Sequence, residues 1–121
     1  RMERIVKETA KAYGASAELE YQFLILPTIN DDACTDIARQ AVTEVLGADA
    51  IHESDLIMGG EDFSFYQEDK PGCFLFVGTY NPACNATYPN HSNYFTSDES
   101  VLAGGSRVYA QMAIDWLKQN S

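Results

Sequence analysis

The stretch "SAELEYQFLILPTINDDACTDIARQAVTEVLG", residues 16–47, changes its hydrophobic period in the middle. Over residues 17–26 apolar and polar side chains alternate, which is typical of a strand with one face in water. Pro27 interrupts this pattern, and from Ala33 to Val45 the apolar residues recur at helical spacing instead. We therefore predict a strand, a helix after it, and a boundary between two modules at residues 27–32.

The helix in this stretch carries its own start and stop signals. Asn30 or Asp31 can cap it, since a side-chain oxygen there can accept a hydrogen bond from a free backbone N–H. Gly47 can end it, because glycine readily takes the left-handed conformation that follows many helices. The same signals predict a helix over residues 2–13, stopped by Gly14.

The remaining elements follow from the same patterns. Residues 50–58 predict a short strand, and the nearly all-apolar residues 73–79 predict a strand covered on both faces. Residues 80–97 form a long loop, and residues 98–118 predict a helix with Thr96 or Ser97 as its N-cap. This order predicts an α/β class, with an α+β piece at its N-terminal end.

Composition excludes several classes of protein. The net charge of −10 would repel a phosphate backbone, so we expect no nucleic-acid partner. The longest apolar run, "FLIL" at residues 23–26, is far too short to cross a bilayer, so we expect no membrane partner. Cys34, Cys73 and Cys84 lack CxxC spacing, which favours reduced thiols and a cytoplasmic location.

The segment "MGGEDFSFY", residues 58–66, is the first candidate site. Gly59 and Gly60 free the backbone to approach a ligand closely, and a helix start at Glu61 or Asp62 would favour a bound carboxylate. The two acidic side chains could also serve in acid–base chemistry or metal binding. A glycine turn with an acidic cap explains the same residues without any ligand.

His91 is the second candidate. It lies in the loop "YPNHSNYFTSDES", residues 88–100, just before the last predicted helix. Neutral imidazole is a common ligand of Zn²⁺ and similar ions, but a metal needs three or four protein ligands. His52 is the only other histidine, so His91 is either an idle loop residue or a ligand whose partners lie elsewhere.

Taken in order, these segments resemble the C-terminal part of the M20 metallopeptidases. The resemblance rests on "YQFLILPTIN", "MGGEDFSFY", "PGCFLFVGT" and "HSNYFTSDESVLAGG", and it covers nearly the whole chain. The most similar branch contains hippurate hydrolase, N-acyl-amino-acid amidohydrolases and indoleacetyl-amino-acid hydrolases. Where the family commonly has H-S-P, this chain has Asn93 in the proline position, which alters the loop without removing the histidine.

The resemblance implies a specific division of the chain. Residues 1–28 would end a lid domain that forms homodimers, and residues 29–121 would be the C-terminal part of a catalytic domain with two divalent metal ions. His91 matches a metal ligand, and Gly59, Gly60 and Glu61 match the turn that faces the acyl-amino-acid or peptide substrate. No catalytic residue is assigned, since the general base and the other ligands would lie outside these residues.

Two functions therefore stand against each other. The first is a fragment of a metal-dependent hydrolase that cleaves amide bonds of N-acyl amino acids or small peptides, inactive without its missing ligands. The second is a non-catalytic, acidic α/β interaction module that dimerises through the strand at residues 17–26. Replacement of His91 separates them, because only the first function needs the imidazole.

Overall fold

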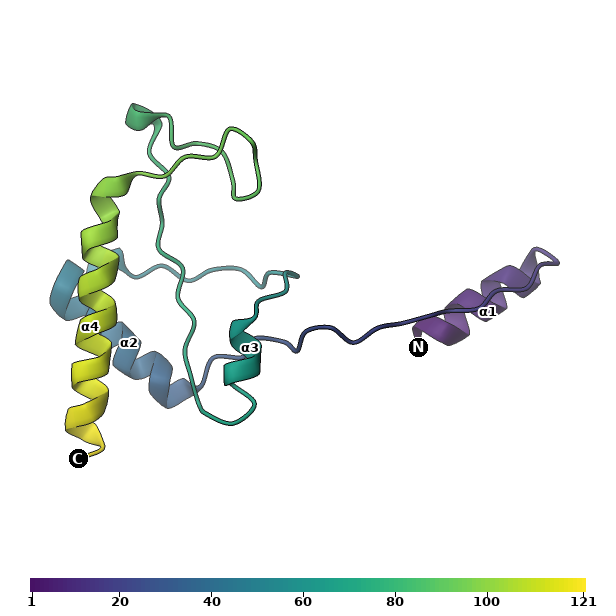
Figure 1. Cartoon of the computed structure of the whole chain (residues 1–121), viewed down its shortest axis with the longest axis horizontal. Helices are drawn as coiled ribbons and strands as arrows, with labels where there is room; N and C mark the ends of the chain where they lie inside the picture. Colours follow the sequence, from purple (N-terminus) through teal and green to yellow (C-terminus); the bar gives the residue numbers. More distant parts are fainter.

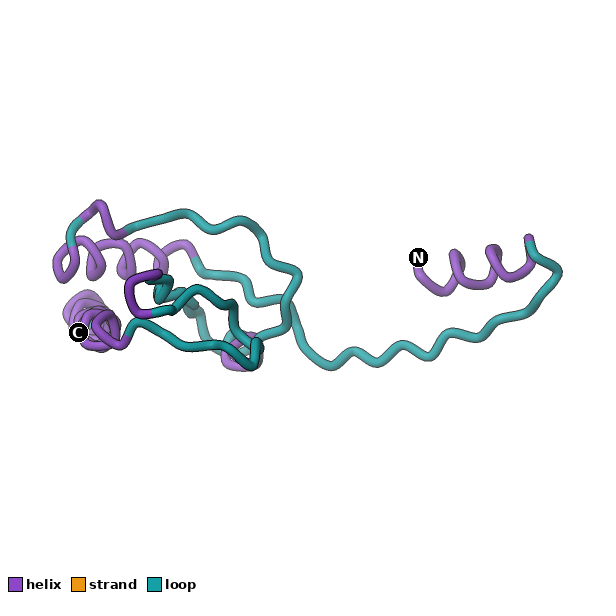
Figure 2. Tube along the Cα trace, turned by 90° about the horizontal axis from the view of Figure 1, so that it is seen from above, coloured by secondary structure: helices purple, strands orange, loops and turns teal.

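The protein has a compact body and a projecting arm. The structure, a computed structural model, describes all of residues 1–121. Its helices are α1 (Met2–Ala12), α2 (Asp32–Leu46), α3 (Phe63–Tyr66) and α4 (Leu102–Gln119), with 3₁₀ turns η1 (Ala48–Ala50), η2 (Pro82–Cys84) and η3 (Glu99–Val101). Figure 1 shows α2, α3 and α4 in the body, while α1 lies at the far end of the arm. After α1 the chain reverses and runs back toward the body (Figure 2).

The helix ends confirm most of the predicted signals. Asp31 caps α2, with its carboxylate accepting a hydrogen bond from the Cys34 N–H at 2.9 Å. Gly47 ends α2 with φ of 93°, a region that side chains other than glycine rarely enter. The predicted caps of the last helix are wrong, because Asp98 accepts the hydrogen bond from the Ser100 N–H that starts η3 ahead of α4.

The packing of α2 against α4 forms the core of the body. The predicted apolar stripe of α2 supplies three of the buried residues, namely Ile37, Ala38 and Ala41, and α4 supplies Val108. A Cβ on Gly104 would lie 3.2 Å from the Leu46 Cδ2, so this glycine permits close approach of the two helices.

The three predicted strands do not form a sheet. The one bridge in the structure joins Asn81 and Ala86, within the long loop. Residues 16–28, 52–60 and 73–78 make no backbone–backbone hydrogen bond, so they run as unpaired chain. A strand is stable only beside another strand, and alternation of side chains cannot supply that neighbour. The α/β class is therefore not confirmed, and the expected double coverage of residues 73–79 is wrong, since Phe76 is 68% exposed.

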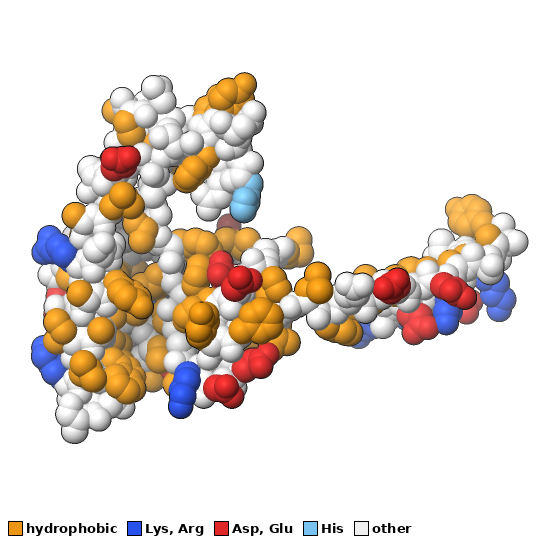
Figure 3. Space-filling model, viewed as in Figure 1, with side chains coloured by type: hydrophobic (Ala, Val, Ile, Leu, Met, Phe, Trp, Pro, Cys, Tyr) orange, Lys and Arg blue, Asp and Glu red, His pale blue; other side chains and the backbone are white.

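Much apolar surface stays uncovered as a result. The accessible surface is 10277 Å², whereas a compact monomer of this mass would expose roughly 6,500 Å². Only 7 of 121 residues are buried, and many large apolar side chains are exposed in both the arm and the body. Figure 3 shows these side chains gathered over the body beside α4 and α3. None of the helices has the length and apolar character needed to cross a lipid bilayer.

Two side-chain amides hold the start of the body together. Asn30 pairs with the backbone of Phe74 in both directions, donating to its C=O at 3.0 Å and accepting from its N–H at 2.8 Å. Gln67 does the same for Ile29, at 2.8 Å and 3.1 Å, and also donates to the Gly72 C=O. These amides take the place of a strand ladder between residues 29–31 and 72–74.

Replacing Asn30 tests this clamp. In the full-length protein, Asn30→Ala removes two hydrogen bonds, each worth about 0.5–1.5 kcal/mol, so we expect a loss of roughly 1–3 kcal/mol in the free energy of unfolding. Asn30→Asp keeps the acceptor for the Phe74 N–H and loses the donor. Its free energy of unfolding should therefore lie between those of the wild type and Asn30→Ala. Denaturant midpoints measure the series, with Asn93→Ala as the matched control. An Asn30→Ala midpoint equal to that of the control would contradict the clamp.

Candidate substrate and metal site

The glycine turn at residues 59–61 is fully exposed at the surface. Neither Gly59 nor Gly60 has positive φ, so the turn does not need glycine for its backbone angles. A Cβ on Gly60 would instead lie 3.2 Å from the Ile25 Cδ1, which shows that the glycine allows the base of the arm to approach.

The helix start beside this turn is already occupied by the chain itself. Glu61 accepts hydrogen bonds through its C=O from the Ser64 N–H at 3.2 Å and the Ser64 hydroxyl at 2.8 Å. Its Oε1 accepts from the Phe63 N–H at 3.3 Å. Because α3 has only four residues, its dipole is small. The start of α3 therefore offers less attraction to a bound carboxylate than the sequence pattern predicted.

Aromatic packing fixes the turn to the body. Phe63 lies with its ring centroid 5.5 Å from that of Phe74, which in turn lies 5.3 Å from that of Phe76. Gly72 makes room for this cluster, since a Cβ there would lie 3.1 Å from the Phe63 Cζ. The start of α3, which follows the turn, is thus packed onto residues 72–76.

His91 occupies a turn of its own in the long loop. Its backbone φ is 68°, an unusual conformation for a residue other than glycine, though one that histidine adopts more often than most. The side chain is exposed, and no hydrogen bond or ion pair engages the imidazole. The rings of Tyr88 and Tyr94 flank this turn at a centroid distance of 5.4 Å. The imidazole is therefore exposed and has no hydrogen-bond or ion-pair partner within the chain.

The base of this loop is closed by one carboxylate. Asp98 accepts a hydrogen bond from the Ser100 N–H at 2.9 Å and another from the Asn81 Nδ2 at 2.7 Å. Asn81 also pairs with Ala86 through both backbone groups. The bonds from Ser100 and Asn81 favour the charged form and lower the pKa of Asp98 below its usual 3.8. The hydrogen bond from Asn81 could not be predicted from the sequence, because the two residues lie 17 positions apart.

This lowered pKa predicts how the loop responds to acid. A carboxylate whose pKa falls on folding contributes stability above pH 3.8, and this contribution is lost as the pH drops through the lower folded pKa. We expect Asp98→Asn to remove that part of the pH dependence. Denaturant midpoints at about pH 6 and pH 3 measure it in the full-length protein. Asn81→Ala, which removes one of the two donors, should reduce the pH dependence only in part; equal pH dependence in all three proteins would contradict the assignment.

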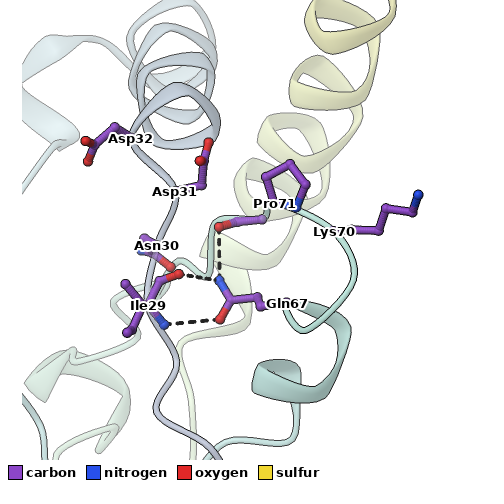
Figure 4. Close-up of a pocket in the computed structure, with 8 residues that line it drawn as sticks. Ile29, Asn30, Asp31, Asp32, Gln67, Lys70 and Pro71 are labelled. Carbon is purple, nitrogen blue, oxygen red and sulfur yellow. Dashed lines mark hydrogen bonds between the residues drawn. The ribbon is translucent and has the colours of Figure 1, made fainter.

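A polar hollow of about 450 Å³ lies at the junction of the arm and the body. Figure 4 shows Gln67 at its centre, bonded to Ile29, with Asp31 and Asp32 above and Lys70 to the side. This hollow could not be predicted from the sequence, because the residues that line it come from segments far apart in the chain. The Gln67 amide is already hydrogen-bonded to Ile29 and Gly72. We therefore interpret the hollow as part of the contact between segments of the chain and not as a ligand site.

A complete metal site is not formed within this chain. No three side chains among its His, Cys, Asp and Glu residues lie close enough to hold an ion together. The structure joins His91 to the 59–61 turn through no hydrogen bond or ion pair. His91 can therefore supply one ligand at most, and no hydrolytic step follows from these residues alone.

Comparison with known proteins supplies the context. Residues 4–115 match peptidase family M20/M25/M40. The chain belongs to this family. The M20 chain is 34% identical over 114 residues to thermostable carboxypeptidase 2 of Saccharolobus solfataricus, covering 93% of this chain and 28% of the relative. It is 33% identical over 121 residues to IAA-amino acid hydrolase ILR1-like 4 of Arabidopsis thaliana, covering 97% of this chain and 28% of that protein.

A third relative of the M20 chain is N-acetylcysteine deacetylase of Bacillus subtilis. It is 35% identical over 113 residues, covering 93% of this chain and 28% of the relative. The chain thus spans little more than a quarter of the length of these relatives. No solved structure matches it closely enough for comparison. Most of each relative has no counterpart in these 121 residues.

Proposed function

We propose that this chain is part of a metal-dependent hydrolase that cleaves the amide bond of N-acyl amino acids or small peptides. The observation that carries the proposal is the family match over residues 4–115. The relatives are named for removing amino acids or acyl groups across such bonds. In the whole protein, residues 1–28 would be the end of a lid domain, and residues 29–121 would be the C-terminal part of the catalytic domain.

His91 is proposed as one ligand of a two-metal centre. Its imidazole is exposed, and it lies in a loop where the rings of Tyr88 and Tyr94 pack against each other. Two divalent ions, when bound, would activate water for attack on the amide carbonyl. Because no three His, Cys, Asp or Glu side chains of this chain cluster together, the remaining ligands and the general base would come from other parts of the protein.

Gly59, Gly60 and Glu61 are proposed to face the substrate. The turn is exposed, and the helix that follows it packs onto the body through Phe63 and Phe74. The backbone of the turn, without side chains at two positions, would let an acyl-amino-acid approach closely.

Hydrolysis assays test the proposed function. The full-length protein, incubated with N-acetyl and N-benzoyl amino acids and with dipeptides, should release free amino acids. Treatment with a chelator should stop the release, and added Zn²⁺ or Mn²⁺ should restore it. The 121-residue chain alone should release none. Full turnover by the isolated chain, or turnover unaffected by the chelator, would contradict the proposal.

A second candidate function is a non-catalytic module that dimerises through the arm. One observation favours it: residues 16–28 have unpaired backbone groups, and Phe23 is 89% exposed. In the enzyme the same surface would form the homodimer contact of the lid. The assays above separate the two, since an interaction module alone would release no amino acid from any substrate.

A further inference from the structure

An apolar hollow between α2 and α4 contains two thiols. Its volume is about 250 Å³, and every residue that lines it is apolar. Cys34 reaches it from the first turn of α2, and Cys73 reaches it from the segment after Pro71 and Gly72. The remaining lining residues are Ile37, Tyr109, Met112, Ala113 and Trp116. Neither thiol belongs to the candidate site described above.

The backbone holds these two segments side by side. The Asp31 N–H donates to the Gly72 C=O at 3.0 Å. The Thr35 hydroxyl, one residue beyond Cys34, lies 3.6 Å from the Cys73 Sγ. On the other side of Cys73, the Asn30 clamp binds the backbone of Phe74. Cys73 is therefore fixed against the first turn of α2 at three successive positions, with Cys34 beside it.

We propose that Cys34 and Cys73 form a reversible disulfide when the protein meets a low-molecular-weight disulfide such as oxidised glutathione. One cysteine thiolate attacks the glutathione disulfide, forms a mixed disulfide and releases one glutathione thiolate. The second cysteine then attacks the protein sulfur of that mixed disulfide and releases the other. Two protein thiols are oxidised, two glutathione thiols are formed, and the two protons pass to the released thiolates or to water.

The order of attack follows from the surroundings of Cys34. Burial, and after it the neighbouring Asp31, raises the pKa of the Cys34 thiol, so this thiol carries little thiolate. The first attack therefore falls to Cys73. Once the mixed disulfide has formed, Cys34 needs to act only across the hollow, where the high local concentration favours ring closure.

The bridge would restrain the part of the chain between its two ends. That part contains α2 beyond its first turn, η1, the 59–61 turn and α3. A cross-link closing so long a loop lowers the entropy of the unfolded chain. Oxidation would thus stabilise the body without adding any new packing.

Cys84 provides the matched control. It is exposed and lies in η2, apart from the hollow. Full-length Cys84→Ser protein is incubated with oxidised glutathione, quenched in acid, alkylated under denaturing conditions and digested without reduction. Chymotrypsin is suitable for the wild type, since it cuts at Tyr80 and separates Cys73 from Cys84.

The expected product is a cross-linked pair of peptides that contain Cys34 and Cys73, with alkylation of both lost. Dithiothreitol should restore both thiols. Cys34→Ser and Cys73→Ser should each abolish the cross-link and leave the other cysteine free or as a mixed disulfide. In the wild type, Cys84 should gain glutathione only. Alkylation of both Cys34 and Cys73 after exposure, separate mixed disulfides at both, or a cross-link that involves Cys84 would overturn the proposal.

Discussion

Replacing His91 by alanine in the full-length protein should remove metal and abolish turnover. Loss of residues that only orient a metal ligand costs about 10- to 100-fold, so loss of a ligand should cost at least about 100-fold in kcat/KM. The side chain is exposed and makes no hydrogen bond within the chain, and alanine at a φ of 68° adds backbone strain of at most about 1–2 kcal/mol, so the fold should stay intact. Metal content by elemental analysis and turnover of an N-acyl amino acid measure the effect.

His52 is the natural control for this experiment. It is the only other histidine, it is also exposed, and nothing assigns it to the site. His52→Ala should keep both the metal content and the turnover of the wild type. If His91→Ala retained near-normal metal and turnover, the proposed ligand role would be wrong. Equal losses in both variants would point to a general effect of removing an imidazole and would also contradict the role.

Replacing Ala41 by aspartate should have the largest effect on stability. Ala41 is 0% exposed, on the face of α2 that packs against α4. A carboxylate there would be buried without a partner, which costs about 3–5 kcal/mol. Since single domains are stable by only about 5–15 kcal/mol, the variant should be largely unfolded or strongly shifted in its denaturant midpoint.

The matched control is Ala110, an exposed residue of α4. Ala110→Asp changes only helix propensity, by about 0.7 kcal/mol or less. Circular dichroism with denaturant, measured on both full-length variants, compares the two. A midpoint for Ala41→Asp that equals the midpoint for Ala110→Asp would mean that the contact between α2 and α4 does not form.

The helices could be predicted from the sequence because their signals are local. Asp31 starts α2 and Gly47 ends it, each through a hydrogen bond to a residue three or four positions away. The apolar residues at helical spacing include the ones that are buried. The strands could not be predicted in this way. Alternation over residues 17–26 shows that the chain suits a sheet, but a ladder needs a second strand, and none pairs with it in this chain.

The candidate site shows the same limit. Its two motifs were found because glycine pairs and a loop histidine stand out in a sequence. The hydrogen bonds that hold the neighbouring chain in place were not predicted. Asn81 binds Asp98, 17 positions away, and Asn30 binds Phe74, 44 positions away. Side-chain amides that replace a backbone partner carry no periodic signal.

The most direct test is the position of bound metal in a crystal structure of the full-length protein. Anomalous scattering at the metal absorption edge locates each ion without reference to the sequence. We predict two ions, one of them about 2.0–2.1 Å from a ring nitrogen of His91, as expected for zinc and imidazole. The 59–61 turn should face the same cavity. Metal bound elsewhere, with His91 directed into solvent, would contradict the account.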